Sequence, residues 1–377
     1  MAGCDQAPGR LASAAVRGIA PYAPGKPVSE LERELGIAEI VKLASNENPL
    51  GPSPSALAAM RAALDDVWLY PDGSGHELKV ALAQHHGVGM DQITLGNGSN
   101  DVLVMLAEAF LTPQTNAVVS QHAFAVYELA IQATGARTRL APAFAADAAM
   151  PYGHDLDAML ALVDEDTRLV FVANPNNPTG TWLTTGQITR FLDRVPKTAI
   201  VVLDEAYFEY ALDFDCPDGV ALTRHYPNLV AVRTFSKAHA LAGVRVGYGV
   251  SHPDVADVLN RIRQPFNVGV PGLAGAQASI SDAEHARRAA ALAVQGRAQL
   301  AAALPKLGVR GFPSAGNFML VDVGRPGRVI YERLLRRGVI VRPVSGYGLP
   351  DCLRITFGTA AQNERLIGAL AASLGDA

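Results

Sequence analysis

The sequence predicts an α/β protein in which a large domain, built on a mostly parallel sheet flanked by helices, is joined to a smaller α+β domain. Apolar runs typical of buried strands alternate with helical patterns between residues 92 and 250, an order that favours a parallel sheet with helices on both faces. After residue 271 the pattern changes to a long alanine-rich helix and short strands. We therefore expect an N-terminal arm with part of the small domain at 1–50, the large domain at 51–275 and the small domain at 276–377.

The N-terminal region begins as an extended arm. Prolines interrupt the stretch IAPYAPGKPV at 19–28, and they remove backbone N–H donors and oppose helix formation. Ser53 followed by Pro54 is a good N-cap and first-turn pair for the alanine-rich helix after it. A turn at 71–73 leads to a second helix, which Gly87 closes.

The segment 92–111 reads as a strand, a glycine-bearing turn and a helix. The turn GNGSN at 96–100 offers backbone N–H groups and a helix N-terminus, which together favour an anion. No G-K-[S/T] sequence follows, and Asp101 stands where a dinucleotide fingerprint requires glycine. The turn is therefore neither a P-loop nor a dinucleotide-binding motif.

The next strand-like runs all end in polar or aromatic residues. The run from 116 leads to Phe124, the run from 168 leads to the turn NPNNPTG, and the run from 199 leads to the sequence DEAY. The run from 229 leads to Ser236 and Lys237, with Arg245 eight residues after the lysine. Open α/β sheets bind their ligands beyond the carboxyl ends of the strands, so we expect these side chains to meet there.

The last hundred residues predict a smaller layer of helices and strands. A long helix at 282–304 is followed by a strand in GNFMLVDV and a helix that Gly338 ends. The runs VIVRP and CLRITFG then read as two further strands before a C-terminal helix. This order favours an α+β arrangement.

Composition excludes several classes of protein. Hydrophobic residues make up 49% and charged residues 18% of the chain, and the net charge of −4 argues against a general nucleic-acid binder. No run of 18 apolar residues predicts a membrane helix, and the N-terminus lacks the apolar stretch of a signal peptide, so we expect a cytoplasmic protein. The widely spaced Cys4, Cys216 and Cys352 predict neither a disulfide framework nor a metal site.

Together, the polar strand ends match the needs of pyridoxal 5'-phosphate (PLP). PLP needs a lysine amine for its aldehyde, a carboxylate for its ring nitrogen and neutral donors for its ring oxygen. Its phosphate suits a helix N-terminus, hydroxyls and an arginine. Candidates for these jobs are Lys237, Asp204, Tyr207 with Asn177, and Ser99 and Asn100 with Ser236 and Arg245, while Phe124 could stack on the ring.

Taken singly, each candidate has a simpler interpretation. Lys237 could be a surface lysine, Asp204 a cap, Asn177 a turn residue and Tyr207 a core residue. Their joint occurrence at strand ends, in this chain order, favours the cofactor site over these four independent explanations.

The motifs NNPTG at 176–180, DEAY at 204–207 and SKAHALAGVRVGY at 236–248 closely resemble those of the class II, fold-type I PLP-dependent aminotransferases. More narrowly, they resemble the histidinol-phosphate aminotransferase family, and the likeness extends over residues 19–370. This resemblance implies PLP as cofactor, no metal, and small-molecule substrates rather than nucleic acid or membrane.

The resemblance also implies a role for each candidate in the cofactor site. Lys237 would be the Schiff-base lysine and the acid and base of the proton shift, assisted by Asp204 at the ring nitrogen and by Tyr207 at the ring oxygen. The other cofactor-binding residues would be Asn177 at the ring oxygen, Phe124 on the ring, and Ser99, Asn100, Ser236 and Arg245 at the phosphate. Tyr70 would reach the cofactor phosphate of a neighbouring subunit, which implies a homodimer.

The implied reaction transfers the amino group of L-histidinol phosphate to 2-oxoglutarate, giving imidazole acetol phosphate and L-glutamate in histidine biosynthesis. Arg354, with Asn177, would bind the carboxylate of the co-substrate, and Arg342, with Tyr22, would bind the substrate phosphate. An arginine fork suits both anions. Relatives usually carry an aromatic or aliphatic residue where this chain has His239, so the resemblance gives His239 no role.

Other functions remain open at this point. An aromatic or broad-range aminotransferase would keep the cofactor residues but would not need a phosphate grip at Arg342 and Tyr22. A PLP-dependent threonine-phosphate decarboxylase would differ in releasing carbon dioxide. A PLP-binding regulator would need a DNA-binding domain, for which we find neither room before residue 19 nor a basic cluster.

Overall fold

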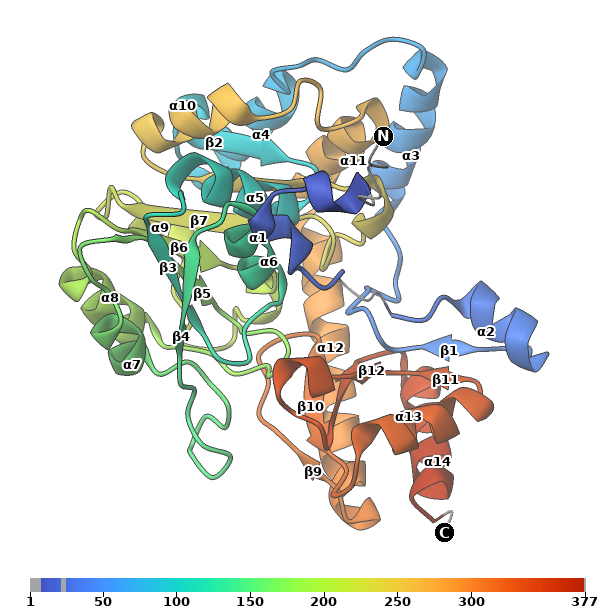
Figure 1. Ribbon diagram of the computed structural model, residues 1–377. Helices are drawn as coiled ribbons and strands as arrows, with labels where there is room; N and C mark the ends of the chain where they lie inside the picture. The colour runs from blue at the N-terminus through green and yellow to red at the C-terminus, as the bar shows by residue number, and fades with distance from the viewer. Residues whose placement is uncertain (1–7, 22–24, 376–377) are drawn as a thin grey trace, which may run out of the picture.

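The structure is a computed structural model that describes residues 8–21 and 25–375 (Figure 1). Its larger sheet has seven strands in the order β2-β8-β7-β6-β5-β3-β4. Neighbouring strands are parallel except in the two pairs that involve β8. In that order the strands are Ile93–Gly96, Gly247–Val250, Leu229–Thr234, Ile200–Asp204, Thr167–Ala173, Asn116–Ser120 and Arg137–Ala141. The predicted fold class, a mostly parallel sheet flanked by helices plus a smaller α+β layer, is confirmed.

Helices cover both faces of this sheet because alternate strand residues point to opposite sides. Phe171 of β5 packs in a core with α5 (Ser99–Phe110) and α6 (Val126–Ala133). Its neighbour Val170 packs on the other face with α7 (Leu156–Ala161) and α8 (Thr185–Arg194). α8 begins with the expected capping box between Thr184 and Gln187.

A third core lies at the β2–β8 side of the sheet. There α3 (Pro54–Ala63), α4 (His76–His86) and α11 (Val270–Ile280) cover buried residues such as Leu95 and Tyr248. α3 has Ser53 as its N-cap and α4 ends at the left-handed Gly87, as the sequence predicts. Other short helices are α1 (Ala14–Arg17), α9 (Gly219–Leu222) and α10 (Pro253–Ile262), and single 3-10 turns include η4 (Phe208–Tyr210), η5 (Ala242–Val244) and η7 (Ser345–Tyr347).

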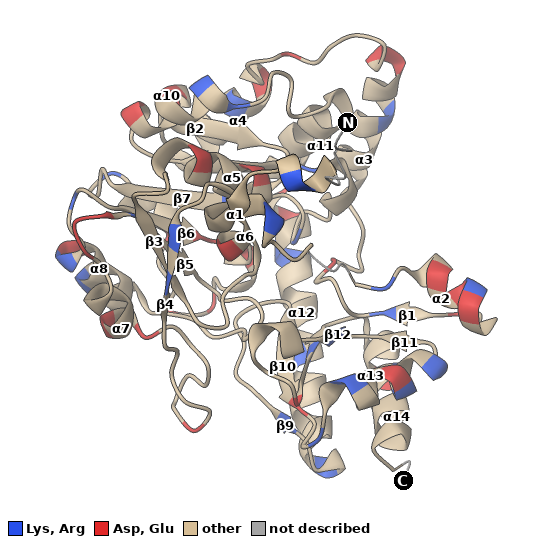
Figure 2. Ribbon diagram, viewed as in Figure 1, with Lys and Arg blue, Asp and Glu red and all other residues tan. Residues whose placement is uncertain are grey.

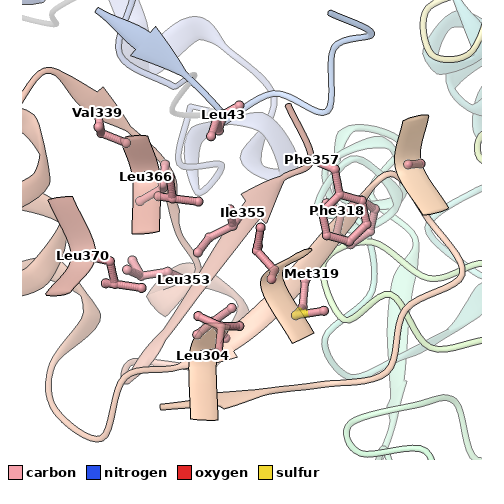
Figure 3. Packing of buried hydrophobic residues seen from close by; sticks show 14 of the residues in the cluster. Leu43, Leu304, Phe318, Met319, Val339, Leu353, Ile355, Phe357, Leu366 and Leu370 are labelled. Carbon is pink, nitrogen blue, oxygen red and sulfur yellow. The ribbon is translucent and has the colours of Figure 1, made fainter. Parts of the chain in front are cut away.

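The C-terminal part forms an antiparallel sheet in the order β12-β13-β10-β9. These strands are Arg342–Pro343, Cys352–Thr356, Phe318–Asp322 and Arg310–Gly311, and the helices around them are α12 (Ala283–Ala303), α13 (Gly327–Arg336) and α14 (Ala360–Gly375). Figure 3 shows their shared core, in which Leu353 and Ile355 of β13 lie near Leu366 and Leu370 of α14.

The N-terminal arm adds a strand to this smaller layer. After α2 (Val28–Leu35), β1 (Val41–Lys42) pairs in parallel with β11 (Val339–Ile340). The predicted single strand VIVRP is therefore wrong: β11 pairs with β1, whereas β12, two residues later, pairs with β13. The division of the chain at residues 50 and 275 stays a prediction.

Charged side chains of both signs occur on the same surface helices. Figure 2 shows Lys or Arg together with Asp or Glu on α2, α8 and α13. Across residues 8–21 and 25–375, none of the helices combines the length and apolar character needed to cross a membrane.

Candidate active site

A cavity of about 530 Å³ lies beyond the carboxyl ends of β5, β6 and β7. The neighbouring parallel strands deliver their end residues to one edge of the sheet, as open α/β sheets do. The smaller layer closes the cavity with β12 and β13. The cavity lining includes most of the predicted site residues: Ser99, Asn100, Phe124, Asn177, Asp204, Tyr207, Ser236, Lys237, Arg245, Arg342 and Arg354.

Lys237 is half-buried and lines this cavity. Its Nζ donates a hydrogen bond of 3.1 Å to the Ser45 carbonyl oxygen and lies 5.7 Å from the centroid of the Tyr207 ring. Burial, followed by the positive charge of Arg354, lowers the pKa of Lys237 to about 8. About a tenth of the amine is therefore neutral at pH 7, and this neutral form is the one that nucleophilic and proton-transfer chemistry requires.

Asp204 is held in a fixed orientation by two donors. The Tyr127 hydroxyl donates to Oδ2 at 2.7 Å, and the Ala206 N–H donates to Oδ1 at 3.2 Å. Burial raises the pKa of Asp204, and these two hydrogen bonds together with Lys237 oppose that rise. Tyr127 itself is fully buried and stacks on Phe171, with 4.9 Å between ring centroids. No sequence motif indicates this pairing, because Tyr127 follows a strand as many core residues do.

Tyr207 is bonded to a residue from the N-terminal region. Asn46 Nδ2 donates to the Tyr207 hydroxyl at 2.7 Å. Asn46 has a left-handed backbone (φ 55°), which asparagine tolerates better than most residues. Thr356 of β13 donates to the side-chain oxygen of Asn46, and Asn317, just before β10, donates to the Asn46 carbonyl oxygen. Burial raises the pKa of Tyr207 to about 12, so its hydroxyl remains protonated and can donate to an oxygen in the cavity.

Ser236, Arg245 and the N-terminus of α5 form a cradle at one end of the cavity. Arg245 Nη1 donates to Ser236 Oγ at 3.3 Å. Gly98 is left-handed (φ +82°), and a Cβ there would lie 2.4 Å from Arg245 Nη2. A Cβ on Gly247 would lie 2.1 Å from the Ser99 backbone nitrogen. The glycines thus leave backbone N–H groups, a hydroxyl and a guanidinium around one space, which suits a phosphate.

Two arginines from the smaller sheet face the same cavity. Arg354 is buried, and its guanidinium donates to Asn177 Oδ1 at 2.5 Å and to the Ala44 carbonyl oxygen at 2.6 Å. Arg342 lies near Gly25 at the arm and lines the cavity as well. Both cations therefore stand where anionic groups of a substrate could enter.

Of the two remaining predicted residues, Tyr70 does not line this cavity. Tyr22 lies outside the described residues. Tyr70 is 82% exposed, and its ring stacks on Phe266 with 4.7 Å between centroids. It belongs to an exposed apolar surface, which we call the Tyr70 surface and define as Leu64, Val67, Trp68, Leu69, Tyr70 and Phe266.

Known proteins share both the sequence and the fold of this chain. "Histidinol-phosphate aminotransferase 2" of Pseudomonas fluorescens (strain Pf-5) is 55% identical, with 96% of each chain covered. The protein of the same name from Nitrosospira multiformis is 53% identical over 98% of this chain and 92% of its own. The crystal structure of histidinol-phosphate aminotransferase from Sinorhizobium meliloti in complex with pyridoxal-5'-phosphate is 31% identical, with a TM-score of 0.87 and coverage of 96% and 97%.

The family match extends over most of the chain. The sequence model described as aminotransferase class I and II matches residues 38–370, which include every described site residue in the cavity. The chain therefore belongs to the family of class I and II aminotransferases.

Proposed function

We propose that this aminotransferase uses PLP to transfer the amino group of L-histidinol phosphate to 2-oxoglutarate, in histidine biosynthesis. Relatives that are 50% to 55% identical carry the name histidinol-phosphate aminotransferase. The observation that carries the proposal is the set of three arginines in one cavity: Arg245 in the cradle, and Arg342 and Arg354 from the smaller sheet. One cofactor phosphate, one substrate phosphate and one carboxylate would account for all three.

The residues present fit PLP. The cavity combines a buried carboxylate, a buried protonated phenol and a lysine with a lowered pKa, and the cradle lacks side chains where a phosphate would lie. When bound, PLP supplies an electron sink for the carbon that carries the amine. Asp204 would hold the proton at the ring nitrogen, Tyr207 and Asn177 would donate to the ring oxygen, and Phe124 would pack on the ring.

Lys237 would carry the proton during the reaction. Its neutral Nζ can accept the proton from the amine-bearing carbon and return it to a neighbouring atom. The pKa of about 8 keeps both forms of the amine accessible near neutral pH. Phe124 lacks a hydroxyl, so it would contribute stacking but no hydrogen bond.

The arginines would select the substrates. Arg354 would bind a carboxylate of 2-oxoglutarate through its planar fork, in place of its present bonds to Asn177 and Ala44. Arg342 would bind the phosphate of histidinol phosphate, with Tyr22 from the arm. A substrate without a phosphate group would not make this interaction with Arg342.

We further propose that the enzyme is a homodimer in the cytoplasm. The Tyr70 surface exposes several large apolar side chains, with Trp68 78% and Tyr70 82% exposed, which favours burial against a second copy. In that dimer Tyr70 would reach the phosphate of the neighbouring site. The free thiols of Cys216 and Cys352 suit a reducing compartment.

A half-reaction tests the substrate. The PLP-loaded protein is mixed with L-histidinol phosphate, L-phenylalanine or O-phospho-L-threonine, and the loss of the cofactor's visible absorbance is followed. We expect histidinol phosphate to react at the lowest concentration, and Arg342→Gln to raise that concentration at least tenfold while leaving phenylalanine unaffected. Preference for phenylalanine would instead indicate an aromatic or broad-range aminotransferase, and carbon dioxide released from phosphothreonine would indicate a decarboxylase.

A further inference from the structure

His239 is a buried histidine that the proposed function leaves without a role. It follows Lys237 by two residues, is 6% exposed, and its ring lies 4.9 Å from that of Phe235. Its Nδ1 is 2.8 Å from the hydroxyl of Ser279 in α11, and its Nε2 is 3.6 Å from Oε1 of Glu209. The imidazole therefore has one polar neighbour at each ring nitrogen.

These contacts connect the two loops that carry the reactive groups. His239 belongs to the loop after β7, which carries Lys237, whereas Glu209 lies in η4 after β6, two residues beyond Tyr207. Because Lys237 and Tyr207 face each other across 5.7 Å, a shift of either loop would change their separation. The His239–Glu209 contact joins the same two loops, two residues after Lys237 on one and two residues after Tyr207 on the other.

The loop after β7 needs such support because its backbone is strained. Ala240 is left-handed (φ 57°), a conformation that costs free energy for a residue with a Cβ and persists only where the surroundings hold it. The turn is closed by the bond from Ala240 N–H to the Lys237 carbonyl oxygen, and Asn48 holds the Ala238 carbonyl oxygen at 2.8 Å. His239 supplies the side-chain anchor between these two residues.

Glu209 depends on His239 in turn. Its Oε2 is buried and has no hydrogen-bond partner among the described residues. The carboxylate favours the tautomer with the proton on Nε2, so that Nδ1 accepts from the Ser279 hydroxyl. The other charged or titratable groups that interact with His239 or Glu209 are His85 of α4, Tyr210 of η4, Arg233 of β7 and Tyr248 of β8. Arg233 is itself paired with Glu205.

We propose that His239 is a positioning residue, which acts through Glu209 to hold the Lys237 loop at its distance from Tyr207. This inference rests on the proposed PLP dependence. The two ring nitrogens then have different roles. Nε2 contacts Glu209 and connects the two loops, whereas Nδ1 contacts Ser279 and anchors the loop to α11.

Three substitutions at this position test the proposal. His239→Leu removes both nitrogens, His239→Gln places an amide near the Nε2 position, and His239→Asn places one near the Nδ1 position. Each variant is measured for its PLP dissociation constant, for the pH midpoint of the visible absorbance of the PLP-loaded protein, and for the Tm of the PLP-free protein. Ser279→Ala is the matched control for loss of the α11 anchor alone.

We expect His239→Leu to weaken PLP binding about tenfold and to move the absorbance midpoint by at least half a pH unit. In His239→Gln the PLP dissociation constant should return to within twofold of the wild-type value, and the midpoint to within a few tenths of a pH unit. His239→Asn should not restore either value, and Ser279→Ala should leave both unchanged. Glu209→Gln combined with His239→Leu should recover part of the affinity, because no charge is then buried unpaired.

Two results would overturn the proposal. One is a His239→Leu protein with wild-type PLP affinity and absorbance midpoint. The other is a series in which His239→Gln and His239→Asn lose PLP affinity equally and in proportion to the fall in Tm. That result would mean that His239 contributes only packing. A wild-type protein that does not bind PLP would contradict the proposed function instead, so the two failures are distinguishable.

Discussion

At the scale of single residues, the Tyr127–Asp204 hydrogen bond determines how strongly the cavity can hold a protonated ring nitrogen. Removing the hydroxyl with Tyr127→Phe leaves Oδ2 without that donor, so the pKa of Asp204 should rise further and its carboxylate form should be less favoured. A hydrogen bond to a charged group contributes about 1.5–3 kcal/mol. We expect PLP to bind at least tenfold more weakly, as measured by equilibrium titration of the PLP-free protein.

Tyr226→Phe provides the matched control for this substitution. The Tyr226 hydroxyl also donates to an aspartate, Asp193, at 2.7 Å, but on the exposed surface. PLP affinity should not change in this variant. If Tyr127→Phe behaved like Tyr226→Phe, Asp204 would not depend on its tyrosine partner.

Residues whose roles depend on local sequence could be predicted, whereas their partners could not. Asp204 ends the apolar strand β6 and Lys237 comes three residues after β7, so their positions at the sheet edge could be derived from the pattern alone. Tyr127 and Asn46 bond to residues 77 and 161 positions away. Such pairs are created by tertiary packing, and no periodicity or motif in one sequence indicates them.

At the scale of elements, the close approach of β8 to the N-terminus of α5 shapes the cradle. Gly247 pairs with Gly96 of β2 and Thr234 of β7, so the strand cannot easily move away from Ser99. Gly247→Ala would place a Cβ 2.1 Å from the Ser99 backbone nitrogen, and α5 would have to shift. We expect at least a tenfold loss of PLP affinity.

The control for this substitution is Gly243→Ala in the neighbouring 3-10 turn. A Cβ at Gly243 would have no atom within 4 Å. Its PLP affinity should equal that of the wild type. Equal affinity in Gly247→Ala would mean that α5 adjusts without cost to the cradle.

Helices with local signals could be predicted from the sequence, whereas short strands defined by distant partners could not. α8 and α12 could be predicted because their N-caps and periodicity are local. The run VIVRP could not, since its division into β11 and β12 depends on two different partners, β1 and β13. β1 pairs with a strand almost 300 positions later in the chain, and a two-residue strand has no periodicity of its own.

At the scale of the whole molecule, the Tyr70 surface makes a prediction about assembly. Trp68 is 78% exposed in one chain, and burying it against a second copy would remove apolar area from water. Trp68→Glu should convert the proposed dimer into a monomer in sedimentation velocity measurements, and PLP affinity should fall with the loss of the neighbour's Tyr70. Leu212→Glu, at another exposed apolar position, should remain dimeric. A dimeric Trp68→Glu protein would place the interface elsewhere.

The lowered pKa of Lys237 should also affect the free energy of unfolding of the whole chain. Its pKa is 10.5 in the unfolded chain and about 8 in the folded one, a difference that corresponds to about 3 kcal/mol. Below pH 8 both states bind the proton, so the folded state carries the full penalty. Between pH 8 and 10.5 the unfolded state binds more protons, so stability rises with pH. Above pH 10.5 both amines are neutral and the penalty is gone.

Replacing Lys237 with methionine should therefore stabilise the PLP-free protein at neutral pH while abolishing transamination. Loss of the bond to the Ser45 carbonyl oxygen offsets about 1 kcal/mol, leaving a gain of about 2 kcal/mol at pH 7. The gain should shrink toward zero or below as the pH approaches 10.5, and the exposed Lys306→Met variant should show neither the gain nor its pH dependence. Denaturant unfolding at pH 7 and pH 10 measures both variants. A gain that did not change with pH would indicate that the effect comes from packing rather than from the buried charge, and that folding does not lower the pKa of Lys237.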